Sequence, residues 1–321
     1  MRLLHKHSTV LVVCLALSSA TTSTASSIAA ESLDWAYPVT PPPKPADNTT
    51  MRRLPDSTKE YTQAQINDLH NPPDWYPSMH PPMPQVVAHG GPKPAGFACA
   101  ACHLPSGDGH PESSGLAGLP AAYIVQQMEA FKRGDRTGVR AGVMVAIAKA
   151  LPASDVKAAA DYFSSLRPTV GFNKIIESGT VPVSYVGAGG MRFSQGGDAR
   201  EPIGQRIIVL PKDAARAAAK DPRSGFFDYV PIGSIAKGKA LATGGDSKSP
   251  ACATCHGLNL KGLGEVPGIG GRTATYIFRQ LSDIKRGSRK GATVALMEPV
   301  VASLSEDDMI SLAAYLESQD P

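Results

Sequence analysis

Two short cysteine–histidine motifs in this 321-residue chain could attach a metal cofactor. They read Cys99-Ala-Ala-Cys102-His103 and Cys252-Ala-Thr-Cys255-His256. The spacing C-x-x-C-H is the attachment motif of c-type haem, in which both thiols bond the haem vinyl groups and the histidine becomes the proximal iron ligand. A redox dithiol or a zinc site also uses paired cysteines, but neither explains a histidine directly after both pairs. The motifs therefore predict two covalently bound haem c groups.

The sixth coordination position of each iron decides whether a haem protein carries electrons or performs catalysis. Met144 follows His103 at the same separation at which Met297 follows His256, and each is expected in a loop ahead of the last helix of its half. A methionine most often packs in a core, but this matched register favours iron ligation by both. A neutral thioether opposite imidazole favours ferrous iron and excludes small molecules, which suits outer-sphere electron transfer.

All of these ligands belong to an internal repeat with a constant offset of 153 residues. The repeat defines two domains, at residues 95–168 and 233–321. Identical pairs at this offset are Tyr123/Tyr276, Ile124/Ile277, Gln127/Gln280, Arg136/Arg289, Leu151/Leu304, Asp155/Asp308 and Tyr162/Tyr315. The chain is therefore predicted to contain one haem domain twice.

Helices have to position these ligands. The spacing of apolar residues in each half predicts where these helices lie. They are expected at residues 119–131 and 154–166 in the first half, and at 233–241, 273–284 and 305–317 in the second. Ser154 and Ser305 are the expected N-caps of the last helices. The backbone carbonyls of Ser114 and Pro267 are placed to accept a hydrogen bond from the proximal histidines.

Basic residues recur between the haem motif and the methionine of each half, in the run Lys-Arg-Gly-x-Arg. Arg136 and Arg289 end these runs and are expected to pair with haem propionates, while the lysines before them are expected to face a partner. His110 is the one further histidine close after a motif. A solvated loop is its expected environment.

The first 30 residues predict a secretory signal peptide that is cleaved between residues 20 and 30. Arg2 and Lys6 precede an apolar run at residues 10–17, which is too short to span a bilayer. Cys14 lies in this run, so every cysteine of the exported chain belongs to a haem motif. Because haem attachment needs reduced thiols in an exported chain, we expect a periplasmic protein without a transmembrane span. The net charge of +4 falls to about +2 without the leader, which gives no reason to expect a nucleic-acid partner.

Two segments lie outside the repeat. Residues 31–94 form a proline-rich N-terminal extension, which is expected to hold no long helix or sheet ladder. Because it contains tryptophans and tyrosines, parts of it are expected to lie against the first domain. A short helix is expected at residues 84–89. Residues 169–232 form a connector with β-prone pieces at 206–210 and 226–230. A connector of this length is expected to be ordered and to lie across both domains.

With these motifs in both halves, the chain resembles the dihaem class I cytochromes c of the cytochrome c4 type. The resemblance covers about residues 99–166 and 233–319, and the extension and the connector are absent from the family pattern. It implies a mainly α fold of two tandem class I cytochrome c domains joined by the long connector. It also implies the following roles: haem attachment by Cys99, Cys102, Cys252 and Cys255, proximal ligation by His103 and His256, and distal ligation by Met144 and Met297.

Three functions remain open for such a chain. The first is a periplasmic carrier that passes single electrons from a quinol-oxidising complex or a dehydrogenase to a terminal oxidase or reductase. The second is a fixed electron-transfer subunit of one dehydrogenase. The third is a dihaem enzyme, such as a peroxidase or a thiosulfate-oxidising cytochrome. Matched methionines oppose a peroxidase, and no cysteine is left for a cysteine-ligated thiosulfate site. The sequence therefore predicts an electron carrier rather than an enzyme.

Overall fold

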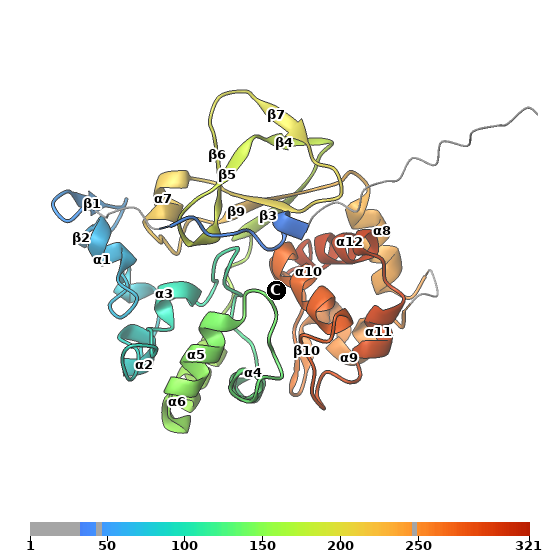
Figure 1. Ribbon diagram of the computed structural model, residues 1–321, viewed down its shortest axis with the longest axis horizontal. Coiled ribbons are helices and arrows are strands. Elements are labelled where there is room, and N and C mark those ends of the chain that lie inside the picture. The colour runs from blue at the N-terminus through green and yellow to red at the C-terminus, as the bar shows by residue number, and fades with distance from the viewer. Residues whose placement is uncertain (1–32, 43–46, 246–248) are drawn as a thin grey trace, which may run out of the picture. The chain divides into compact units, whose positions relative to one another are not determined.

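Each copy of the repeat folds as a set of helices around its cysteine–histidine motif (Figure 1). The computed structural model describes residues 33–42, 47–245 and 249–321, so the predicted signal peptide lies outside the described residues. Residues 33–321 form one compact unit. Within the described ranges, no helix has both the length and the apolar character needed to cross a membrane.

The first copy carries its motif on α3 (Ala100–His103), followed by α4 (Ala121–Arg133), α5 (Gly142–Ala150) and α6 (Ala153–Ser165). Helix α4 ends at Gly134, whose left-handed φ of 80° lets its N–H bond the carbonyls of the last turn. The core lies between α4, α6 and the short α2 (Gln85–Ala88). Helix α6 begins after the N-cap Pro152, so the prediction that Ser154 caps this helix is wrong. Proline has no side-chain acceptor, so the first N–H groups of α6 have no side-chain cap from this residue.

The second copy repeats this order, with its motif on α9. Its elements are α8 (Ser234–Ala242), α9 (Ala253–His256), η4 (Leu258–Leu260), β10 (Gly262–Leu263), β11 (Val266–Pro267), α10 (Ala274–Lys285), α11 (Glu298–Ala302) and α12 (Glu306–Glu317). Ser305 caps α12 as predicted, in a reciprocal capping box with Asp308. Helix α8 packs tightly on α12 because Gly238 has no side chain: a Cβ there would lie 1.9 Å from the carbonyl oxygen of Ser311. The end helices of this copy therefore form a close pair.

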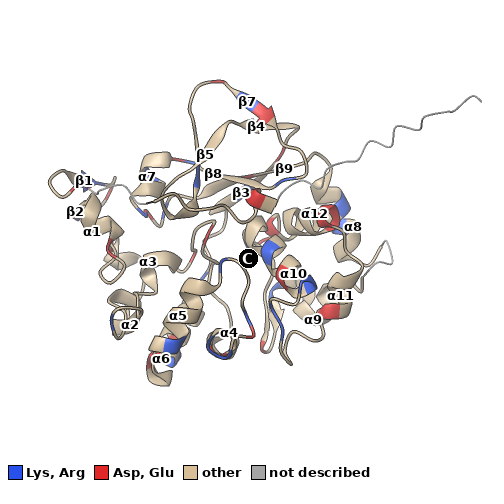
Figure 2. Ribbon diagram, viewed as in Figure 1, with Lys and Arg blue, Asp and Glu red and all other residues tan. Residues whose placement is uncertain are grey.

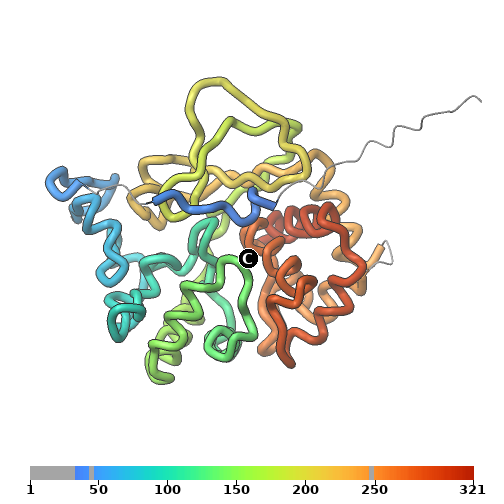
Figure 3. The backbone as a smooth tube through the Cα atoms, in the orientation of Figure 1, coloured from blue at the N-terminus to red at the C-terminus, as the bar shows by residue number. Residues whose placement is uncertain are grey.

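The connector is richer in β-structure than its two β-prone pieces predict. Its main sheet has the order β3 (Asn173–Glu177), β9 (Phe226–Val230), β8 (Ile208–Pro211), with β3 parallel and β8 antiparallel to β9. The remaining elements are β4 (Thr180–Pro182) paired with β7 (Arg200–Pro202), β5 (Ser184–Val186) paired with β6 (Arg192–Ser194), η3 (Ala188–Gly190) and α7 (Ala214–Ala218). In Figure 3 this segment is the yellow part of the tube.

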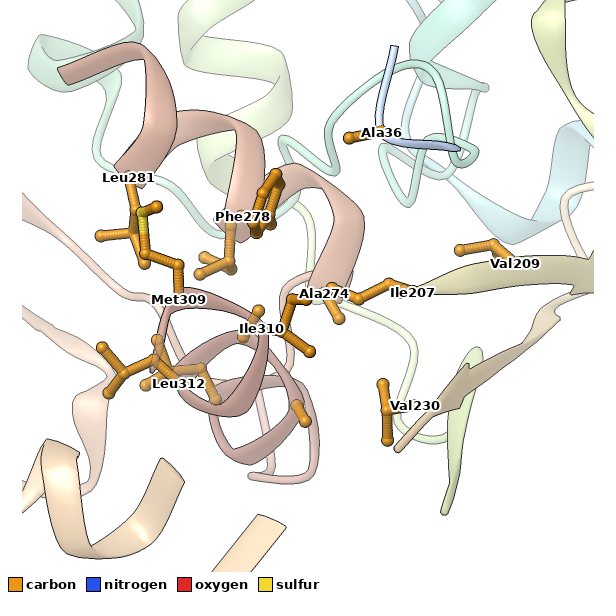
Figure 4. Packing of buried hydrophobic residues seen from close by; sticks show 14 of the residues in the cluster. Ala36, Ile207, Val209, Val230, Ala274, Phe278, Leu281, Met309, Ile310 and Leu312 are labelled. Carbon is orange, nitrogen blue, oxygen red and sulfur yellow. The ribbon is translucent and has the colours of Figure 1, made fainter. Parts of the chain in front are cut away.

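The connector sheet and the second copy share one apolar core. Ile207 and Val209 of the β8 region and Val230 of β9 lie toward α10 and α12 of the second copy (Figure 4). Phe278 of α10 and Ile310 of α12 are their buried partners in this core. Because burial of apolar side chains is the main favourable term in folding, this shared core fixes the sheet to the second copy.

The two tryptophans of the N-terminal extension pack on the second copy and on the connector. Trp35, at the end of η1 (Leu33–Trp35), packs on Phe278 of the second copy with ring centroids 4.6 Å apart. Trp75 donates a 2.8 Å hydrogen bond to the carbonyl of Ala219 in the connector. Other parts of the extension do lie against the first domain as predicted: α2 packs in its core, and Tyr37 lines its cavity.

The extension also forms more regular structure than its prolines suggest. A short antiparallel ladder joins β1 (Met51–Arg53) to β2 (Glu60–Thr62), contrary to the expectation of no ladder. The helices α1 (Gln63–Asn67) and η2 (Pro77–Met79) follow before α2, which confirms the short helix expected at residues 84–89. The ladder lies in residues 51–62, where Pro55 falls in the turn rather than in a strand.

Candidate haem sites

The two proximal histidines have equivalent hydrogen bonds. His103 Nδ1 lies 2.8 Å from the carbonyl oxygen of Ser114, and His256 Nδ1 lies 2.9 Å from that of Pro267. Because a carbonyl can only accept, Nδ1 is the protonated nitrogen in both rings and Nε2 is left free for a metal. Burial lowers the pKa of both imidazoles, which keeps them neutral. Both predicted carbonyl partners are confirmed.

The four motif cysteines differ in exposure between the copies. Cys99, Cys102 and Cys252 are half-buried, whereas Cys255 is exposed. Burial raises the pKa of the Cys99 thiol to about 12 and also raises the pKa of Cys102 and Cys252. These thiols are therefore neutral near pH 7 and are held in apolar surroundings, which suits thioether bonds to a hydrophobic macrocycle.

A cavity of about 580 Å³ opens beside the first motif. Cys99, Cys102 and His103 line it from α3, and Met144 lines it from α5. Its apolar wall includes Leu116, Leu119, Ile124, Met128, Phe131 and Ile147. Cofactor sites usually have volumes of about 300–1,000 Å³ and mostly apolar walls. The donor set and the wall therefore fit a haem group attached to Cys99 and Cys102.

The two predicted distal methionines lie close to the beginnings of helices. Met144 is in the first turn of α5, and Met297 is the N-cap residue of α11. Met144 shares the cavity with His103, and Met297 packs against the core of the second copy. The expectation of a loop is confirmed for Met297, which lies in the turn before α11, and is wrong for Met144, which lies within α5.

Arg136 and Arg289 lie at a contact between the two copies. Each arginine donates to Gln127 Oε1 and to Gln280 Oε1, at distances of 2.8–3.0 Å. Arg289 also donates to the hydroxyl of Tyr123 at 3.1 Å. Both arginines line the 580 Å³ cavity, so a role toward propionates is compatible with these bonds. The sequence showed that these residues recur, but not that the recurring residues of the two copies meet.

His110 is not in a solvated loop, contrary to the prediction. It is half-buried, lines the cavity, and its Nδ1 accepts a 3.3 Å hydrogen bond from the backbone N–H of Glu112. Burial lowers the pKa of His110 to about 3, so its imidazole is neutral near pH 7. His110 is shielded from solvent because Arg279 of the second copy and Lys220 of the connector cover this loop.

Segments outside the repeat also contribute to the first cavity. Tyr37 and Leu69 line it from the extension, and Lys220 lines it from the connector. Lys220 has a left-handed φ of 55°, which is uncommon for a side chain of this kind. Sequence reasoning missed these residues because no motif marks them. Helix α10 carries two basic residues, Arg279 at this cavity and Lys285 at its C-terminal end. Lys and Arg are blue in Figure 2.

Comparisons with known proteins agree with this arrangement. Residues 235–320 match the family model for cytochrome c. The chain is 30% identical over 231 residues to the thiosulfate dehydrogenase electron acceptor of Thiomonas intermedia (strain K12), covering 70% of this chain and 80% of that protein. It is 25% identical over 225 residues to cytochrome c4 of Pseudomonas aeruginosa, covering 68% and 82%. The solved thiosulfate dehydrogenase TsdBA of Marichromatium purpuratum is similar with a TM-score of 0.46 and 29% identity, over 70% of this chain and 37% of that one.

Proposed function

Because the chain belongs to the class I c-type cytochromes of the cytochrome c4 type, we propose that it carries single electrons on two covalently attached haem groups. A bound haem iron alternates between the ferric and ferrous states and thereby takes up or releases one electron. The observation that carries the proposal is the repetition of one donor set, in which each C-x-x-C-H motif has the same histidine–carbonyl bond and a methionine at the same register.

The side chains of this protein have simple roles in that function. Cys99 and Cys102 hold one haem, and Cys252 and Cys255 hold the other. His103 and His256 present Nε2 in a fixed direction, since their Nδ1 atoms are engaged. Met144 and Met297 complete the coordination and keep small molecules from the iron. The apolar wall of the first cavity limits access of water, so little reorganisation accompanies electron transfer.

We further propose that the protein works in the periplasm after removal of the leader. Its donor is a quinol-oxidising complex or a dehydrogenase, and its acceptor is a terminal oxidase or reductase. The relative from Thiomonas intermedia, which is named an electron acceptor of thiosulfate dehydrogenase, favours a dehydrogenase as donor. It also supports the second candidate function, a fixed electron-transfer subunit of such an enzyme.

Mass and spectra test the proposal directly. The intact mass under denaturing conditions should equal the polypeptide plus two haems. The oxidised protein should be low-spin and should show sulfur-to-iron charge-transfer absorption, of which Met144→Ala removes about half. A mass equal to the bare chain contradicts haem attachment. A high-spin haem that binds cyanide or peroxide rapidly contradicts the carrier and supports a peroxidase.

Purification from native membranes distinguishes the two electron-transfer roles. A fixed subunit should remain with one dehydrogenase through gel filtration at high salt, whereas a mobile carrier should elute alone. In the second case, the isolated protein should still be reduced by the separately purified dehydrogenase.

A further inference from the structure

A buried ion cluster lies beside the first haem cavity. Glu112 Oε1 accepts a 3.0 Å hydrogen bond from Arg279 Nη2, and Glu112 Oε2 forms a 2.9 Å ion pair with Arg140 Nη2. The side chains of Glu112 and Arg279 are only 7% and 6% exposed, and that of Arg140 is 28% exposed. All three residues line the cavity. The Arg279 contact is a charge-assisted hydrogen bond, whereas the Arg140 contact is an ion pair without hydrogen-bond geometry.

The cluster connects the two sides of the first haem site. Glu112 precedes by two residues Ser114, whose carbonyl accepts the hydrogen bond from His103. Arg140 precedes Met144 by four residues, at the beginning of the segment that presents this methionine. The Glu112–Arg140 pair therefore joins the loop on the histidine side to the segment on the methionine side.

Backbone carbonyls hold both arginines in place. Arg279 Nη1 donates to the carbonyl of Pro111 at 3.0 Å, and its Nε donates to the carbonyl of Ala36. Arg140 Nη1 donates to the carbonyl of Pro38 at 3.1 Å. The extension thus fixes the cluster from outside the repeat, while α10 of the second copy supplies Arg279. With both guanidinium groups anchored, Arg140 resists displacement of the methionine segment.

The second copy has no equivalent ion pair at the same positions. Glu265 occupies the position of Glu112, but it is exposed and accepts a 2.7 Å hydrogen bond from the neutral amide of Gln126. Gln126 in turn occupies the position of Arg279. Thr293 occupies the position of Arg140 and is exposed and uncharged. The site of Met297 therefore lacks charges at two of the three positions.

We propose that Glu112, Arg140 and Arg279 are positioning residues that hold Met144 on the first iron more firmly than Met297 is held on the second. This inference rests on the proposed ligation by both methionines. Dissociation of Met144 requires its segment to move, and that movement separates Arg140 from Glu112. Breaking a buried ion pair is costly because it leaves an uncompensated charge. No such cost opposes movement of Met297.

Competition with imidazole tests the proposal on the full-length oxidised protein. Added imidazole replaces a methionine ligand and removes its sulfur-to-iron absorption. The loss should occur in two phases, and Met144→Ala identifies the phase that belongs to each site. In the unmutated protein, the second site should lose its methionine at an imidazole concentration about tenfold lower than the first, because the Glu112–Arg140 ion pair opposes release at the first site only. Equal concentrations for the two sites would overturn the proposal.

The repeat supplies a matched pair of variants. Glu112→Gln should lower the imidazole midpoint of the first site about tenfold and leave the second unchanged. Glu265→Gln, at the same register in the other copy, should change neither. An unaltered first midpoint in Glu112→Gln would contradict the inference, as would an equal shift in Glu265→Gln.

A second variant covers the case in which Glu112→Gln does not fold, since that change leaves two buried guanidinium groups facing each other. Arg140→Gln keeps the Glu112–Arg279 pair and removes the contact to the methionine segment, and it should lower the same midpoint. If Arg140→Gln leaves that midpoint unchanged, the proposal is wrong. Absence of sulfur-to-iron absorption from the unmutated protein would contradict the proposed function instead, so the two failures are distinguishable.

Discussion

The two proposed haem sites repeat the same candidate ligands but differ in what surrounds them. The first site lies in a cavity whose lining includes residues of the extension, the connector and the second copy. In the second site Cys255 is exposed, and so are Leu258 and Leu296, which follow the proximal histidine and precede the methionine. The repeat thus keeps the candidate ligands in both copies, while segments outside the repeat make the surroundings of the two sites unequal. We infer that the first site is built for retention of its ligands and the second for access.

Removal of one haem at a time should have the largest effect on this comparison. The double variants Cys99→Ser/Cys102→Ser and Cys252→Ser/Cys255→Ser should each lose one of two haems by mass. The first should also lose far more thermal stability, because an enclosed apolar cavity is left without its filling. Calorimetry of both variants measures the difference. If the two melting temperatures fall equally, the second haem is as deeply enclosed as the first.

Replacement of Trp35 tests the contribution of the extension. Trp35→Ala should cost about 3–5 kcal/mol of unfolding free energy, because its ring is 5% exposed and packs on Phe278. The change should also release Tyr37, which lines the first cavity and donates to Asp283. Denaturant unfolding provides the measurement. Val39→Ala is the control, since this neighbouring side chain is 86% exposed and its truncation should leave stability unchanged. A loss below about 1 kcal/mol for Trp35→Ala would mean that the extension is not a structural part of the second copy.

The sequence predicted the parts of each site that repeat, and it missed the parts that do not. The histidine–carbonyl bonds of Ser114 and Pro267 followed from the motif and the register, and the structure confirms them. Helix positions such as α12 followed from caps and apolar spacing. These features are local, or recur at one offset, so a single sequence contains enough information to find them.

The unpredicted features are long-range contacts between unlike residues. Glu112 and Arg279 are 167 residues apart, and the counterpart of Arg279 in the first copy is Gln126, so no repetition marks the pair. Trp35 packs on the second copy, and the sequence could not predict this, because an aromatic ring in a proline-rich segment can pack on any apolar face. His110 was misplaced for the same reason: its burial depends on what the second copy and the connector lay over it.

A buried carboxyl pair between the connector and the second copy should make the stability of their shared core depend on pH. Asp228 of β9 is fully buried and faces Glu317 at the end of α12, whereas Ser164 occupies the position of Glu317 in the first copy. Burial raises the pKa of Asp228 to about 7, against a weaker opposing effect of Lys212, and burial likewise raises the pKa of Glu317. The Glu317 carboxylate also accepts a hydrogen bond from the N–H of Ala274.

The sign of this effect follows from the raised pKa. A carboxyl group that binds its proton more tightly in the folded state stabilises the fold at low pH, and this stability is lost as the pH rises through about 7. Asp228→Asn, which keeps the shape and can donate to Glu317, should raise the melting temperature at pH 8 by several degrees and change it little at pH 5. Asp213→Asn, on the exposed start of α7, is the control for the lost charge. A variant that melts at the unmutated temperature at both pH values would show that the pair carries no titration.

Charge reversal at two matched lysines should have the smallest effect, and it asks which site meets a redox partner. Lys132 lies in the last turn of α4 and Lys285 ends α10, and both are exposed. Exposed charges near a docking site act mainly on the association rate, and salt screens them because the Debye length falls from about 30 Å at 0.01 M to about 10 Å at 0.1 M. With an acidic redox partner, the second-order rate should therefore fall as the ionic strength rises.

If the partner docks at the more open second site, Lys285→Glu should lower the rate severalfold at low salt and Lys132→Glu should lower it less. Lys157→Glu, which makes the same charge change on the exposed face of α6, is the control, and the haem content of all three should be unchanged. A greater effect of Lys132→Glu would move docking to the enclosed first site. A rate indifferent to salt and to both reversals would leave the two lysines as solvated helix ends and direct the search for docking to the extension and the connector.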